Sequence, residues 1–157
     1  MSRPRRSSTS SAALSTDDVL HFLRAIWRLE HALERASKRM EDTMGISGPQ
    51  RFALRMIGTR PGLTASELAD ALHLHRSTIT GITRRLASRR LITRSANNTD
   101  GRVVHLHLTD AGRAITKPAA AGTIERAVTR TLTRTTPRQR MAAETLLNDL
   151  TDELTRI

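Results

Sequence analysis

Residues 76–88 combine basic and hydroxylated side chains in a pattern that suits contact with DNA. Ile79, Ile82 and Leu86 recur at helical spacing, which predicts an amphipathic helix with one apolar side. At 3.6 residues per turn, the opposite side carries small hydroxyl groups and guanidinium groups. Such a surface fits a groove and offers hydrogen-bond donors to base edges and phosphates. The predicted DNA-binding residues of this segment are Arg76, Ser77, Thr78, Thr80, Arg84 and Arg85.

A basic hairpin is predicted after this segment. Residues 91–94 begin one strand and residues 103–108 return as the second, joined by a polar connection that contains Asp100-Gly101 and Arg102. A helix pair followed by a charged hairpin is typical of proteins that grip duplex DNA. The alternative for Arg84 and Arg85 is a solvated helix end, because cations also complement the helix dipole there. The alternative for Arg102 is an exposed hairpin residue paired with Asp100.

Two histidine pairs have spacings that also occur in metal sites. His105-x-His107 lies on one face of the predicted return strand, and His73-x-His75 lies in a predicted turn. No carboxylate or cysteine cluster completes a ligand set, so we expect no metal and read these histidines as exposed or turn residues. The chain also lacks a glycine-rich phosphate loop and a Ser/His/Asp set, so we expect neither an enzyme nor a cofactor.

Composition favours a mostly helical nucleic-acid-binding protein. The 157 residues include 26 Lys and Arg against 15 Asp and Glu, which gives a formal charge of +11. A field of that sign attracts polyanions. Aromatic residues make up only 2%, which argues against a large sheet and against RNA modules that stack bases. The absence of cysteine excludes disulfides and a thiol redox switch. No apolar run is long enough to span a bilayer.

The helical elements are delimited by local signals. Asp17 or Asp18 is expected to cap a first helix that stops at Gly45. Further starts are predicted at Ser47-Gly48-Pro49, at the Thr64–Glu67 capping box, at Thr109-Asp110 and at Thr136-Pro137. The turn at 73–75 is expected to bury Leu74, and Pro118 to kink or interrupt its helix.

These signals predict a mainly α fold with a small β-hairpin wing, a winged helix-turn-helix domain plus a helical dimerisation region. The predicted ranges are a disordered basic tail (1–16), a dimerisation helix (17–46), the DNA-binding domain (47–112) and C-terminal dimerisation helices (113–157). The tail has an Arg/Ser content like that of a transit peptide, but it has no apolar segment of a secretory signal. We therefore expect a cytoplasmic protein without a membrane partner.

The segment between about Ser47 and Gly112 resembles the MarR-type winged helix-turn-helix regulators. The residues that carry the resemblance are Pro61-Gly62-Leu63-Thr64, Glu67-Leu68-Ala69, Ser77-Thr78-Ile79-Thr80, Leu86, Leu91-Ile92-Thr93-Arg94, Asp100-Gly101-Arg102 and Leu108-Thr109-Asp110-Ala111-Gly112. The resemblance implies a homodimer joined by its first and last helices. It implies a recognition helix in the major groove, with Arg102 in the adjacent minor groove, oriented by Asp100, and Thr80 facing the major groove. It also implies release of DNA when a phenolic or lipophilic ligand binds.

Two residues depart from the family pattern. Gly81 stands where the family more often has a bulky polar or basic residue, so one base contact is expected to be missing. Arg90 replaces a common glycine before Leu91. We expect the backbone to turn differently there, because a positive φ would cost arginine roughly 1 kcal/mol.

The leading hypothesis is a sequence-specific, dimeric transcriptional regulator, a ligand-responsive repressor. One alternative is a nonspecific architectural protein of the nucleoid type, driven by the positive charge. A second alternative is a winged-helix module that binds proteins. Trp27 is expected in the core or at the dimer interface, with the effector pocket as its alternative place.

Overall fold

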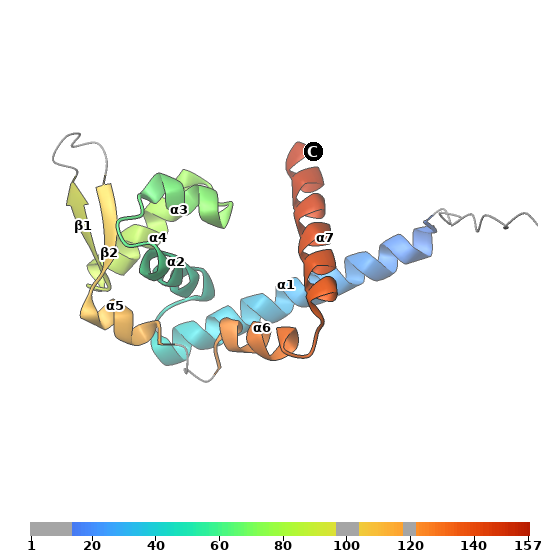
Figure 1. Ribbon diagram of the computed structural model, residues 1–157, viewed down its shortest axis with the longest axis horizontal. Coiled ribbons are helices and arrows are strands. Elements are labelled where there is room, and N and C mark those ends of the chain that lie inside the picture. Colours follow the sequence, from blue (N-terminus) through green and yellow to red (C-terminus); the bar gives the residue numbers. More distant parts are fainter. Residues whose placement is uncertain (1–13, 97–103, 118–121) are drawn as a thin grey trace, which may run out of the picture. The chain divides into compact units, whose positions relative to one another are not determined.

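The computed structural model describes residues 14–96, 104–117 and 122–157 (Figure 1). Its contacts divide the chain into two compact units, residues 1–34 and 35–157. The described part is mostly helical, with one antiparallel hairpin, as the sequence predicts. None of its helices combines the length and the hydrophobicity that crossing a bilayer requires.

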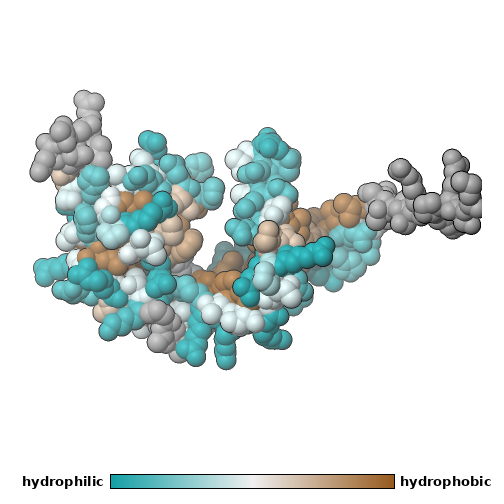
Figure 2. Space-filling model, in the orientation of Figure 1, coloured by the Kyte–Doolittle hydropathy of each residue, from teal (hydrophilic) through white to brown (hydrophobic). Residues whose placement is uncertain are grey.

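The first unit contains most of the long helix α1 (Thr16–Met44). Ser15 caps this helix: its hydroxyl accepts a hydrogen bond from the Asp18 backbone N–H at 3.1 Å, and its own N–H donates to the Asp18 carboxylate at 3.0 Å. Asp18 therefore completes the cap as the acidic partner, whereas the sequence suggested Asp17 or Asp18 as the cap itself. Trp27 is 60% exposed in the single chain, which excludes the core and leaves the dimer interface, or the effector pocket, as its expected place. The apolar residues of this stretch are likewise exposed (Figure 2), namely Val19, Leu20, Phe22, Leu23, Leu29 and Leu33.

The second unit is built on a core that runs from Ile46 to Leu106. Three helices supply most of it: α2 (Gly48–Thr59), α3 (Ala65–Leu72) and α4 (Arg76–Ser88). Each helix turns an apolar stripe inward, as helical periodicity requires. The buried side chains come from α2 (Ala53, Leu54, Ile57), α3 (Leu68, Ala69) and α4 (Ile79, Ile82, Leu86).

The hairpin closes this core from the side (Figure 1). Strand β1 (Ile92–Ala96) pairs antiparallel with β2 (Val104–Leu108), with Ile92 opposite Leu108 and Arg94 opposite Leu106. Leu106 is fully buried. Its backbone also bonds the loop before α3: its N–H donates to the Leu63 carbonyl at 3.0 Å, and its carbonyl accepts from Gly62 at 3.1 Å. The wing is thereby fixed to the helix pair.

Local capping positions α3. The Thr64 hydroxyl accepts from the Glu67 backbone N–H at 3.2 Å, and the Thr64 N–H donates to the Glu67 carboxylate at 2.8 Å, which confirms the predicted capping box. The hydrogen bond from the Thr64 backbone N–H lowers the pKa of the exposed Glu67 carboxyl most, and the hydrogen bond from the Thr64 hydroxyl lowers it further. Because the folded-state pKa is lowered, this stabilisation is present above the unfolded pKa and is lost as pH falls through the folded one.

Both helices of the pair end in the same way, with a left-handed residue that is not glycine. His73 has φ +50° and Arg90 has φ +55°. In each case the next residue, Leu74 or Leu91, donates its N–H to the carbonyl five residues back, at 3.0 and 2.9 Å. This is the Schellman arrangement, which usually uses glycine. The expectation that the backbone would avoid positive φ at Arg90 was therefore wrong.

The two leucines that follow these left-handed residues differ in burial. Leu91 is buried as part of the core, but Leu74 is 37% exposed, so its predicted burial was wrong. A hydrophobic contact by the residue after the left-handed one usually accompanies the Schellman arrangement. In the turn between α3 and α4 that residue is Leu74, which stays partly exposed in the single chain.

Replacing Arg90 with glycine is expected to raise the free energy of unfolding by about 1 kcal/mol, because it removes the left-handed strain of a residue that carries a Cβ atom. Urea unfolding at fixed protein concentration measures this change. Arg90→Ala is the matched control, since it removes the same charge but keeps the Cβ atom, and it should give no gain. An equal gain in both variants would assign the effect to charge instead of backbone conformation.

The last helices follow the hairpin. Helix α5 (Asp110–Ile115) is capped by Thr109, and α6 (Ile124–Leu132) by Thr123. The predicted interruption falls between them, and Pro118 itself lies outside the described residues. Helix α7 (Pro137–Arg156) begins at the predicted Thr136 cap, whose capping box with Gln139 is present.

Gly112 explains why α5 can approach the base of the hairpin. A Cβ atom at this position would lie 2.1 Å from the Leu91 carbonyl oxygen, a distance that no side chain tolerates. The Thr109 hydroxyl bonds the adjacent Arg90 carbonyl at 2.7 Å, and the Thr109 N–H bonds Leu91 at 3.1 Å. The glycine in the Asp-Ala-Gly sequence therefore serves close packing.

Candidate DNA-binding interface

Helix α4 presents the predicted groove-facing surface to solvent. Ile79, Thr83 and Leu86 are fully buried against the core, which fixes the rotation of the helix. The opposite side is exposed at six of the predicted positions, Arg76, Ser77, Thr78, Thr80, Arg84 and Arg85. Gly81 lies among them, and a Cβ atom there would meet nothing within 4 Å. The structure thus brings the six predicted residues of α4 onto one accessible face.

The hydroxyl of Thr80 has a defined orientation. It donates to the Arg76 carbonyl at 2.8 Å, as threonine often does within a helix. Its proton is therefore already used, and the side chain presents its methyl group and oxygen lone pairs outward. These groups suit the methyl group of thymine or the amino groups of adenine and cytosine.

The N-terminus of α4 is open to an anion. His75 occupies the N-cap position but makes no side-chain hydrogen bond to the first turn. A helix N-terminus with free N–H groups favours a phosphate oxygen, through both hydrogen bonds and the helix dipole. This end and the basic side chains of α4 together match the contacts that fix a protein on a duplex.

The wing is held against α4 by a contact that sequence reasoning missed. Arg94 on β1 donates from Nη2 to the hydroxyl of the buried Thr83 at 3.2 Å. Arg94 belongs to a run that resembles the family, but an exposed strand arginine gives no signal of its partner. The nearest signal was Thr83 itself, a polar residue next to Ile82 on the apolar side of α4. This bond joins the first strand of the wing to α4.

The tip of the wing lies outside the described residues. The predicted minor-groove residue Arg102 and its predicted partner Asp100 both fall in 97–103. Their roles remain predictions from the sequence. The described strands that lead to this tip are anchored to the core by Ile92 and Leu106.

The histidine pairs form no ligand cluster in the described part of the chain. No group of three or more His, Cys, Asp or Glu residues there is placed to hold a metal ion. His105 instead bonds the Gly62 carbonyl through Nδ1 at 2.7 Å, and so joins β2 to the loop before α3. His73 and His75 lie in and next to the turn between α3 and α4, as expected.

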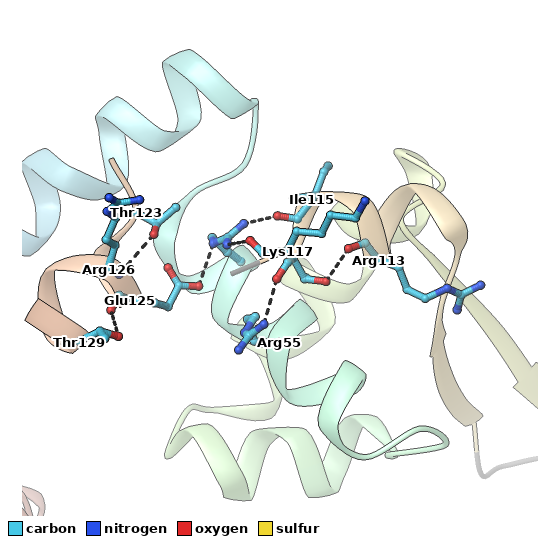
Figure 3. A network of polar contacts seen from close by, with 10 residues as sticks. Arg55, Arg113, Ile115, Lys117, Thr123, Glu125, Arg126 and Thr129 are labelled. Atoms are coloured by element: carbon cyan, nitrogen blue, oxygen red, sulfur yellow. Dashed lines mark hydrogen bonds and ion pairs between the residues drawn. The ribbon is translucent and has the colours of Figure 1, made fainter. Parts of the chain in front are cut away.

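A second polar network joins α2 to the end of α5 and the start of α6 (Figure 3). Arg51 is only 1% exposed. Its Nε donates to Glu125 Oε1 at 2.8 Å, its Nη1 to the Ile115 carbonyl, and its Nη2 to the Lys117 carbonyl at 3.2 Å. One turn later, Arg55 donates from Nη1 to the Thr116 carbonyl at 2.9 Å.

The break between α5 and α6 explains why this network forms. The last carbonyls of a helix have no partner within it and carry the negative end of its dipole. The two arginines of α2 supply donors and positive charge to that end, while Glu125 lies in the first turn of α6, where a negative charge is favoured. Sequence reasoning missed this role, because arginines on a helix usually indicate a solvated side.

Known proteins are similar to this chain at the levels of both sequence and fold. A family model, that of the MarR family, matches residues 46–104. The HTH-type transcriptional repressor Rv2887 of Mycobacterium tuberculosis is 30% identical over 128 residues, which span 81% of this chain and 90% of that repressor.

Solved structures share the fold. The PcaV transcriptional regulator from Streptomyces coelicolor, crystallised with its natural ligand, is 26% identical with a TM-score of 0.70; the match covers 88% of this chain and 97% of PcaV. Sco3205, a MarR family regulator from the same organism in complex with DNA, has a TM-score of 0.74 at 21% identity, with 90% of this chain and 93% of Sco3205 covered. The second likeness concerns the fold alone.

Proposed function

The chain belongs to the MarR family of winged helix-turn-helix transcriptional regulators, and from that premise we propose that it is a ligand-responsive repressor that binds specific DNA sequences. The family is one of regulators, not of enzymes. The observation that carries the proposal is the exposed face of α4, where hydroxyl and guanidinium groups stand opposite a fully buried apolar side.

The proposed DNA contacts follow the geometry of that face. Residues Ser77 and Thr80 would reach base edges in the major groove, and Arg84 and Arg85 would reach bases or phosphates further along it. The wing would place Arg102, oriented by Asp100, in the adjacent minor groove. The proposed DNA-binding domain is 47–112, which agrees with a core that extends from Ile46 to Leu106.

We propose a homodimer joined by residues 17–46 and 113–157. Support comes from apolar side chains that find no cover in the single chain. Besides those of α1, they include Val128 and Leu132 on α6 and Leu146, Leu147 and Leu154 on α7. Exposed apolar surface of this extent commonly marks an interface between subunits. A dimer presents two copies of α4 to two half-sites of a duplex.

Ligand control and a cytoplasmic location complete the proposal. The relative PcaV was crystallised with its natural ligand, which supports effector control of this chain as well. Trp27, exposed on α1, remains a proposed lining residue of an effector pocket or of the dimer interface. A chromosomal target places the proposed action in the cytoplasm.

Competition between duplexes tests the proposal. A labelled duplex from the gene's own upstream region should bind at least about a thousandfold more tightly than random duplex, and the affinity should fall steeply with salt. Random duplex that displaces the probe as well as the specific duplex does would favour the architectural alternative, which none of the comparisons supports. No duplex binding at moderate salt would favour the protein-binding module.

A further inference from the structure

The hydrophobic core supports only the base of the wing. In β1 the first residue, Ile92, is buried and the four residues that follow are exposed. In β2 only Leu106 is buried, and its neighbours along the strand are half-buried. Successive strand residues point to opposite faces, so Arg94, which pairs with Leu106, shares the core-facing side with Ile92. Beyond this level, the described part of β1 has no buried apolar side chain to anchor it.

Polar contacts tie the two strands to different elements. Strand β2 is tied to the loop before α3, through the backbone of Leu106 and through Nδ1 of His105, which lies 2.7 Å from the Gly62 carbonyl oxygen. Strand β1 is tied to α4, through the bond from Arg94 Nη2 to Thr83 Oγ1 at 3.2 Å. Among the described residues, no other side-chain hydrogen bond joins β1 to α4. Beyond the base of the wing, the placement of β1 against α4 therefore depends on this bond.

The acceptor of the bond is a fully buried threonine. The hydroxyl of Thr83 also donates to the Thr80 carbonyl at 3.2 Å, so both its proton and a lone pair are used. A buried hydroxyl is unfavourable unless it is hydrogen-bonded. Valine has nearly the same shape as threonine and would need neither bond. Packing alone therefore does not require the hydroxyl, which instead supplies an acceptor for Arg94 inside the apolar side of α4.

The hydrogen bonds continue to the groove-facing side of α4. Thr80, whose carbonyl accepts from Thr83, is exposed, and its own hydroxyl donates to the Arg76 carbonyl at 2.8 Å. The wing strand is thus linked, through Thr83, to a residue that is proposed to read bases. Elements that are held in place before binding lose less conformational entropy than elements that the partner must order.

We propose that Arg94 is a positioning residue for DNA recognition: its bond to Thr83 sets the wing against α4 so that both enter neighbouring grooves of one duplex. The inference rests on the DNA contacts proposed above, and it gives Arg94 itself no contact with DNA. The bond helps only where α4 and the wing are both seated, as on a specific duplex. Random duplex is held mainly by attraction to its phosphates, which this bond does not change. The bond therefore contributes to sequence preference more than to overall attraction.

Thr83→Val tests the bond, because it removes the acceptor and leaves every charge in place. Binding to the upstream duplex should weaken by at least about fivefold, the size of one net hydrogen bond, while binding to random duplex changes less than about twofold. Thr83→Ser retains the hydroxyl and should retain the affinity. Thr116→Val is the matched control, because Thr116 is also buried, lies at the end of α5 and donates to the carbonyl three residues back at 3.0 Å. It should leave both affinities unchanged in fluorescence anisotropy.

Arg94→Gln tests the donor, and because Arg94 is exposed this change leaves the fold intact. Its loss should match that of Thr83→Val after correction for Arg138→Gln, which removes one exposed charge from α7. Combining Thr83→Val with Arg94→Gln should weaken binding no further than Arg94→Gln alone, because both changes break the same bond. If Arg94 instead touched a phosphate, Thr83→Val would have no effect and Arg94→Gln would reduce the salt slope by about one. That result would overturn the proposal.

A double-mutant cycle shows whether the wing or α4 uses the bond. Arg102→Ala should cost a smaller factor in the Thr83→Val background than in the wild type, because a misplaced wing already contributes less. Arg84→Ala, on α4, should cost the same factor in both backgrounds. An undiminished effect of Arg102→Ala, or a diminished effect of Arg84→Ala, would assign the Thr83 hydroxyl to the shape of α4 and would contradict the positioning role.

The wing can also be observed without DNA. The chain contains no cysteine, so Ser95→Cys on the exposed part of β1 accepts a single nitroxide label per chain. The electron paramagnetic resonance spectrum should show faster motion of the label when Thr83→Val is added, and no change when Thr116→Val is added. Identical spectra in all three proteins would mean that β1 is held without this bond, and the proposal would fail.

These outcomes separate the inference from the proposed function. If the wild type prefers its upstream duplex and the variants of Thr83 and Arg94 keep the full preference, the repressor stands and the positioning role falls. If the wild type shows no preference over random duplex, the proposed function falls and the inference falls with it.

Discussion

Arg51→Met is expected to lower the free energy of unfolding by about 3 kcal/mol. Removing one partner of a buried ion pair usually costs about 3–5 kcal/mol, because the other charge is left without compensation. We place this pair at the low end, since the Glu125 side chain keeps 35% of its surface exposed. The carbonyls of Ile115 and Lys117 also lose their donors. Urea unfolding at fixed protein concentration measures the loss, because dimer stability depends on concentration.

Two further variants isolate the cause. Arg156 on α7 pairs with Glu153 at the surface, where both side chains are mostly exposed, so Arg156→Met should cost less than about 1 kcal/mol. Combining Arg51→Met with Glu125→Met removes both charges and should recover part of the loss, which a double-mutant cycle measures. A cycle with no interaction energy would mean that Arg51 stabilises the protein only through its packing and its carbonyl bonds.

Arg102→Ala is expected to weaken binding to the specific duplex by about 1–3 kcal/mol, or roughly 5–150-fold, if the side chain makes a desolvated contact in the minor groove. Arg84→Ala on α4 should have an effect of similar size from the major groove. Because the two proposed contacts lie in different grooves, their effects should add in the double variant. Fluorescence anisotropy with a labelled upstream duplex measures all three affinities.

A charge-matched control is needed, because any lost arginine weakens the attraction to DNA. Arg138→Ala removes one exposed positive charge from the start of α7, outside the proposed DNA-binding surface. It should change the affinity for the duplex by less than about 0.5 kcal/mol. Unchanged binding by the Arg102 variant would remove the wing from the mechanism. A loss of equal size in the Arg138 variant would show that only overall charge matters.

Elements with local signals could be predicted from the sequence. Helix α4 begins and ends where its periodicity indicates, and the caps at Thr64, Thr109 and Thr136 all form. Capping and periodicity depend on neighbours within one or two turns, so the sequence contains all the necessary information. The exposure of the groove-facing side of α4 follows from the same periodicity.

Features that depend on distant partners could not be predicted. Arg51 is indistinguishable in sequence from a solvated helix arginine, and its partners lie 64–74 residues away. The bond between Arg94 and Thr83 spans two elements whose packing is decided by the core. The predictions for Leu74 and Arg90 were wrong for a related reason. The way the helix ends pack decides their conformation, and it leaves Leu74 exposed and gives Arg90 a left-handed backbone conformation that glycine would usually take.

Gly81 has a consequence for the history of this protein. It stands in the middle of the proposed DNA-facing side of α4, where a Cβ atom would meet nothing within 4 Å. On the proposed contacts, a single codon change at this position would add a side chain that can reach a base without disturbing the scaffold, and the loss of a helical glycine itself favours stability. After gene duplication, such a copy could acquire a new operator while the parent keeps the old one. The space beside Gly81 would therefore let the preferred DNA sequence change by single substitutions.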